Sequence, residues 1–78
     1  MKITVNADTH DLAPGTTCRD LVATLTGTDV GADGLGPDGR GLGIAVAVNG
    51  EVVPRSTWQA TALAEGAEVE IVTAVQGG

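Results

Sequence analysis

The stretch from residue 44 to residue 56 reads IAVAVNGEVVPRS, and it places two strands next to each other. Residues 44–48 are all apolar, and their β-branched members favour a strand. Asn49-Gly50 is the dipeptide typical of a two-residue hairpin turn, so residues 51–53 should return antiparallel to the first strand. Pro54 has no N–H to donate to a ladder and should end the pairing. The stretch therefore predicts a β-hairpin.

The segment before it supplies a second hairpin and a helix. Residues 2–6 alternate polar and apolar side chains, and residues 9–12 can return as the partner strand. Thr17 is a predicted helix N-cap, and Asp20 stands where it can complete a capping box. Apolar residues recur at helical spacing from here to Gly27, where the helix should end; they are Cys18, Leu21, Val22 and Leu25.

Residues 27–43 differ in composition from everything around them. Seven of these seventeen residues are glycine. Such a segment buries little apolar surface, so we expect a mobile surface loop with few backbone hydrogen bonds and no ligand. Residues 34–39 spell G-x-G-x-x-G, but they would follow a helix and lead into a strand, the reverse of a dinucleotide-binding turn. The sequence gives no indication of an internal repeat.

The C-terminal segment completes an α+β roll. Ser56 is the expected N-cap of a short helical turn, and Gln59 stands three residues later, where it can complete a capping box. Residues 65–66 should turn the chain into a last strand over residues 68–74. Residues 76–78, Gln-Gly-Gly, would follow as a tail. The predicted order is β-β-α-β-β-β, a single domain with one main helix.

Composition excludes several classes of function. Ten acidic residues against four basic ones give a formal net charge of −6, which opposes binding to nucleic acid or to an anionic membrane. Cys18 is the only cysteine, so neither an internal disulfide nor a cysteine-based zinc site is available, and we expect it in the core. The aspartates of the glycine-rich loop lack the spacing of a calcium loop, so no metal site is expected. With no signal peptide and no membrane span in view, we expect a cytoplasmic protein.

The sequence resembles the ThiS family of sulfur carriers in four segments. These are residues 46–56 followed by Trp58, residues 69–78, residues 1–6 and residues 14–17. The resemblance implies an α+β, β-grasp (ubiquitin-like) roll with a mixed sheet of about five strands, one main helix and a flexible C-terminal Gly-Gly tail. It implies a domain over residues 1–75 and a tail over residues 76–78. Residues 27–43 do not match, because the family usually connects helix to strand more briefly.

The resemblance also implies a function. In this family a ThiF-type adenylyltransferase consumes ATP to adenylate the terminal glycine, here Gly78. A persulfide sulfur, from a cysteine desulfurase or another donor, then converts the adenylate to a thiocarboxylate. A ThiG-type thiazole synthase uses that sulfur in thiamine biosynthesis. The chain itself would be a sulfur donor with no catalytic residue and no bound cofactor, and not an enzyme.

Two sets of residues should make the contacts with these partners. Val75, Gln76 and Gly77 would enter the partner as an extended tail, because glycine presents no side chain to a narrow channel. A small apolar docking patch should lie on the outer face of the sheet if the strands that carry it are neighbours. Its expected members are Ala45, Ala47, Val72 and Ala74.

Other functions remain open at this point. A molybdopterin-type or other β-grasp sulfur carrier shares the fold and tail, and only residues 53–58, Val-Pro-Arg-Ser-x-Trp, and residues 75–78, Val-Gln-Gly-Gly, favour the thiamine pathway. A non-covalent β-grasp binding module would leave the Gly-Gly end idle. Incubation with ATP and an activating enzyme distinguishes a sulfur carrier from a binding module, since a module gains no adenylate. An independent enzyme is least supported, because the sequence offers no acid–base pair, nucleophile or metal cluster.

Overall fold

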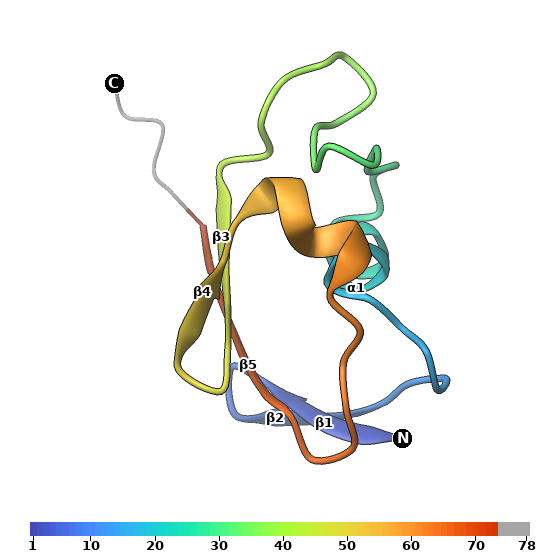
Figure 1. Cartoon of the computed structure of the whole chain (residues 1–78), viewed down its shortest axis with the longest axis vertical. Coiled ribbons are helices and arrows are strands. Elements are labelled where there is room, and N and C mark those ends of the chain that lie inside the picture. The colour runs from blue at the N-terminus through green and yellow to red at the C-terminus, as the bar shows by residue number, and fades with distance from the viewer. Residues whose placement is uncertain (74–78) are drawn as a thin grey trace.

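The computed structural model describes residues 1–73, which form one mixed sheet with its helices on one face (Figure 1). The sheet has five strands in the order β2-β1-β5-β3-β4. β5 lies parallel to β1, and all other neighbouring strands are antiparallel. Within the described residues the elements are β1 (Lys2–Val5), β2 (Asp8–Asp11), α1 (Cys18–Thr26), β3 (Ile44–Val48), β4 (Glu51–Val53), the 3-10 helix η1 (Arg55–Ala60) and β5 (Glu68–Thr73). The predicted α+β class and element order are confirmed.

Both hairpins turn on an asparagine with a left-handed backbone. Asn49 and Gly50 have φ angles of 51° and 83°, the pattern of the predicted two-residue turn. Asn6 and Ala7 have φ angles of 49° and 73°, so the first hairpin uses the same geometry. β2 therefore begins at residue 8, one residue earlier than predicted.

Helix α1 begins and ends as predicted. The Thr17 hydroxyl accepts a hydrogen bond from the Asp20 N–H, and the Asp20 carboxylate accepts one from the Thr17 N–H, which completes the capping box. Gly27 ends the helix with a φ of 68°. Leu25, which the spacing placed on the apolar stripe, is 44% exposed because the helix ends one residue later.

The expected cap of the second helical segment is wrong. η1 begins after Pro54, and Ser56 makes no capping hydrogen bond. Pro54 supplies a φ of −58°, which already suits the start of a helical turn. The Thr57 hydroxyl donates to the Pro54 carbonyl at 2.9 Å instead. Here the geometry of the proline decides where the helix begins.

The core lies between the inner face of the sheet and the two helices. Trp58, on η1, is 2% exposed and donates its indole N–H to the Val53 carbonyl at 3.0 Å. Cys18 is fully buried, as predicted. The other buried side chains are Ile3, Val5, Leu21, Val22, Val30, Val46, Leu63, Ala67 and Val69. No buried side-chain polar atom among the described residues lacks a hydrogen-bond partner.

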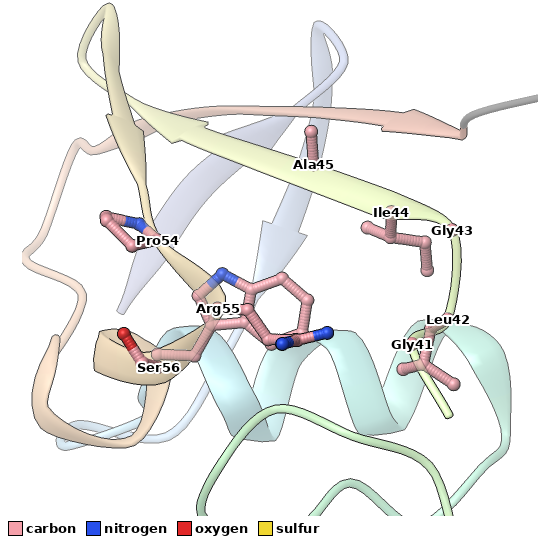
Figure 2. Close-up of a pocket in the computed structure, with 9 residues that line it drawn as sticks. Gly41, Leu42, Gly43, Ile44, Ala45, Pro54, Arg55 and Ser56 are labelled. Atoms are coloured by element: carbon pink, nitrogen blue, oxygen red, sulfur yellow. The ribbon is translucent and has the colours of Figure 1, made fainter. Parts of the chain in front are cut away.

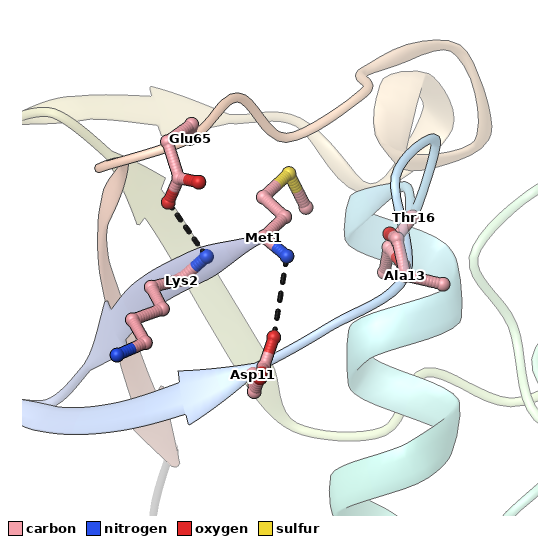
Figure 3. Close-up of polar contacts among 6 residues, drawn as sticks. All are labelled: Met1, Lys2, Asp11, Ala13, Thr16 and Glu65. Atoms are coloured by element: carbon pink, nitrogen blue, oxygen red, sulfur yellow. Dashed lines mark hydrogen bonds and ion pairs between the residues drawn. The ribbon is translucent and has the colours of Figure 1, made fainter.

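Polar contacts at the start of β1 join it to β2 and to the loop that precedes β5 (Figure 3). The amino group of Met1 lies 3.2 Å from the Asp11 carboxylate, and the Lys2 N–H donates to Glu65 at 2.6 Å. The Thr16 hydroxyl donates to the Ala13 carbonyl and closes the turn that leads into α1. The contacts of Met1 and Lys2 hold β1 in place at the start of the chain.

The glycine-rich segment is built from two turns of the same design, which the sequence analysis missed. In the first turn, residues 31–35, the Gly31 N–H donates to the Leu35 carbonyl at 2.8 Å, and the Gly34 N–H donates to the Gly31 carbonyl at 2.9 Å. Residues 36–40 repeat both bonds at 2.8 and 3.0 Å. In each turn the aspartate, Asp33 or Asp38, accepts from the N–H two residues later. The expectation of few backbone hydrogen bonds is therefore wrong, and the sequences GADGL and GPDGR form a tandem repeat.

This segment is also anchored to the domain. Val30 is 4% exposed and belongs to the core, and its carbonyl accepts a hydrogen bond from the Arg19 Nε at 2.7 Å. Gly34 packs so closely on Arg55 that a Cβ there would overlap the Arg55 side chain and lie 2.7 Å from its carbonyl oxygen. The first turn therefore rests on η1.

Removal of the second turn, residues 36–40, should leave the fold intact. Its ends meet through the hydrogen bond between Gly36 and Arg40, so the chain can close with little movement. Val30→Ala, in contrast, empties a core position and should cost about 1–3 kcal/mol of unfolding free energy. Urea denaturation of both variants compares the two effects. A deletion as damaging as Val30→Ala would mean that the second turn supports the domain.

Candidate functional site

β5, the strand that precedes the predicted tail, lies in the middle of the sheet. β1 flanks it on one side and β3 on the other. It is described as far as Thr73, which lies opposite Ile44 at the start of β3. The predicted tail residues Val75, Gln76, Gly77 and Gly78, and the predicted patch residue Ala74, lie outside the described residues. The candidate site is therefore described as far as Thr73, the last described residue before the predicted tail.

The described members of the expected docking patch come together on the outer face. β3 and β5 are neighbours, and Ala45 lies opposite Val72. Ala45 is exposed and points away from α1 (Figure 2), and Val72 is 60% exposed. Ala47 shares this face and is half-buried, opposite Glu70. Val46, which lies between these two alanines on β3, is buried and faces the core.

Val52 is a fourth member that the sequence analysis did not include. It lies opposite Ala47 in the β3–β4 hairpin and is 75% exposed. The signal was present in the sequence, since a two-residue turn at Asn49-Gly50 fixes which residues pair. We call Ala45, Ala47, Val52 and Val72 the outer patch. Glu70 borders it on β5, so a partner that covers the patch also meets a carboxylate.

An open hollow lies on the helix side of the sheet, between η1 and the start of β3 and across the strand from the outer patch (Figure 2). Ile44 and Ala45 line it from β3, and Arg55 and Trp58 line it from η1. The glycine-rich segment closes one side through residues 41–43. Because Ile44 lies opposite Thr73, the glycine-rich segment reaches the same end of the sheet as the last described residue of β5.

The described residues supply no reactive side-chain constellation. Burial raises the pKa of the Cys18 thiol, with a smaller opposing effect from a backbone hydrogen bond, so the fully buried thiol is a poor source of thiolate. Within residues 1–73, no group of three or more His, Cys, Asp or Glu side chains is placed to hold a metal ion. None of the helices in that range has the length and apolarity to cross a membrane.

Comparison with known proteins agrees with this arrangement. The model of the ThiS family matches residues 3–78. The chain is similar to a crystal structure of thiamine biosynthesis protein ThiS from Geobacter metallireducens, with 25% identity, a TM-score of 0.72 and full coverage of both chains. An NMR structure of a thiamine biosynthesis protein from the same organism gives 29% identity and a TM-score of 0.67, over all of this chain and 88% of that one. No curated protein sequence matches. The structural likeness confirms the β-grasp fold.

Proposed function

Because the chain belongs to the ThiS family of thiamine-biosynthesis sulfur carriers, we propose that its sulfur travels as a thiocarboxylate on Gly78. The observation that carries the proposal is the family match, which runs through β5 and includes residues 77–78. The central position of β5 supports it, because the strand that precedes the tail is held by neighbours on both sides.

The proposed chemistry begins with an unreactive group. A carboxylate is a poor electrophile, so one of its oxygens attacks the α-phosphorus of ATP, and pyrophosphate leaves. The resulting acyl adenylate is attacked by a persulfide sulfur, and AMP leaves with the bonding electrons of the C–O bond. Reductive cleavage of the remaining S–S bond by a thiol frees the thiocarboxylate. The partner enzymes supply ATP, persulfide and thiol.

The proposed division of labour rests on membership of the ThiS family. The accessible surface of β3, β4 and β5 offers apolar contact area and a carboxylate, and the one thiol is buried. The chain therefore contributes recognition and position, and a ThiF-type adenylyltransferase contributes catalysis. A ThiG-type thiazole synthase would receive the sulfur, and a cysteine desulfurase or another persulfide donor would supply it. We propose that these steps take place in the cytoplasm.

The outer patch is the proposed docking surface for the adenylyltransferase. Its side chains are short and lie on a regular sheet, which gives a flat apolar contact. Glu70 at its border would pair with a basic residue of the partner, in keeping with the net charge of −6.

Val72→Glu and Val52→Glu should each weaken binding to the adenylyltransferase about tenfold or more, because each places a charge in an apolar contact. Thr9→Glu is the matched control, since Thr9 is exposed on β2, at the far edge of the sheet. Titration calorimetry measures all three, and melting curves check that they fold. Equal affinities for the three variants would place the interface elsewhere.

A further inference from the structure

Two asparagine side chains form hydrogen bonds with the backbone of β5 at positions just past the ends of its neighbouring strands. Asn6 follows β1, and its amide makes both bonds that a paired residue would make with Ile71. Its Nδ2 donates to the Ile71 carbonyl at 3.1 Å, and its Oδ1 accepts from the Ile71 N–H at 2.8 Å. The Asn6 backbone N–H also donates to Val69 at 2.9 Å. The side chain thus extends the β1–β5 ladder after β1 has ended.

Asn49 makes a comparable contact at the other end of β5. It follows β3, and its Oδ1 accepts from the Glu68 N–H at 2.9 Å while its backbone N–H donates to the Glu68 carbonyl at 2.7 Å. Asn6 and Asn49 have the same side chain, the same place in a two-residue turn and nearly the same φ. They differ in which residue of β5 they contact. Asn49 bonds to Glu68, the first residue of the strand, and Asn6 bonds to Ile71, two residues before its end at Thr73.

We propose that Asn6 is a positioning residue for sulfur loading, because it fixes the end of β5 from which the tail departs. Without its amide, the backbone at Ile71 loses its partner on the β1 side, and β3 alone holds the last residues of the strand. The end of a strand paired on one side only opens more often than one paired on both. Each opening moves the base of the tail relative to the docked outer patch, and with it the carboxylate.

The inference rests on the proposed function and adds a kinetic consequence to it. The outer patch lies on β3, β4 and β5, and Asn6 contributes none of its side chains. Loss of the Asn6 amide should therefore leave docking unchanged and lower the fraction of docked complexes whose carboxylate reaches ATP. The expected signature is a lower kcat for adenylation with little change in KM.

Asn6→Gly and Asn49→Gly form a matched pair for the test. Glycine accepts the positive φ at both positions without strain, and the added freedom of the unfolded chain is the same in both variants, so they differ in which amide contact is lost. NMR hydrogen exchange of the Ile71 amide should accelerate about tenfold or more in Asn6→Gly and stay near the unmodified value in Asn49→Gly. Asn6→Asp, which keeps the acceptor and loses the donor, should fall between Asn6→Gly and the unmodified chain.

The same variants are then compared as substrates of the adenylyltransferase. We expect kcat to fall for Asn6→Gly by the fraction of docked chains in which the end of β5 is open, about twofold if open and closed forms become equally populated, and to stay near the unmodified value for Asn49→Gly at a similar melting temperature. Equal kinetics for the two glycine variants would overturn the inference while the proposed function stood. If an adenylyltransferase that is active on another carrier never adenylates the unmodified chain, the proposed function fails first and the inference with it.

Discussion

A chain that lacks Gly78 should acquire no sulfur when it is incubated with adenylyltransferase, ATP and a persulfide donor. The unmodified chain should show the replacement of one oxygen by sulfur in its intact mass. The reason is positional, since the reacting carboxylate would then sit on Gly77, one residue short of the site. One extended residue spans about 3.3–3.6 Å, more than an in-line attack on phosphorus tolerates.

Two controls distinguish a misplaced carboxylate from a loss of binding to the adenylyltransferase. A chain with one extra residue after Gly78 should also fail, because its carboxylate overshoots the site. Both altered chains should melt like the unmodified one and bind the adenylyltransferase with similar affinity, since the outer patch is unchanged. Sulfur on the shortened chain would contradict the assignment of Gly78. Absence of sulfur on all chains, with an enzyme active on another carrier, would favour a non-covalent binding module.

Trp58→Ala should unfold the domain at physiological temperature. Trp58 is the only aromatic residue in the chain and is 2% exposed, so truncation leaves a large cavity between η1 and the sheet. A cavity of this kind costs about 3–5 kcal/mol. A core in a chain of this size supplies roughly 3–5 kcal/mol of net stability. The loss therefore matches the whole stability of the fold.

Trp58→Phe isolates the polar part of this contribution. Phenylalanine keeps most of the buried ring but cannot donate to the Val53 carbonyl, so a loss of about 1–3 kcal/mol is expected. Urea denaturation followed by far-ultraviolet circular dichroism measures both variants without relying on tryptophan fluorescence. A folded Trp58→Ala chain with near-normal stability would show that the core closes around the gap.

Local chemistry predicted the elements more reliably than their assembly. The Asn49-Gly50 turn and the capping box between Thr17 and Asp20 are short-range patterns, and the structure confirms both. The position of β5 between β1 and β3 joins segments far apart in the chain, and only the resemblance to a family indicated it. Composition misled at residues 27–43, because the glycines serve two repeated turns and Val30 reaches the core.

The candidate site was also predictable only in part. Alternation along the strands placed Ala45, Ala47 and Val72 on one face. The register of the hairpin implied Val52 as well, but the pairing had to be worked out residue by residue to find it. Nothing in the sequence distinguishes the side chain of Asn6 from that of an ordinary turn residue. Its role follows only from the contact with Ile71, sixty-five positions along the chain.

The place of β5 in the sheet also governs when the protein can fold during synthesis. The β1–β2 and β3–β4 hairpins do not pair with each other, and β5 is the strand that joins them. It is the last of the described elements to leave the ribosome, so the two hairpins stay unjoined until residues 68–73 have emerged. A nascent chain that stalls earlier has no complete sheet and is exposed to proteolysis. Because the outer patch spans β3, β4 and β5, it is complete only once β5 has joined the two hairpins.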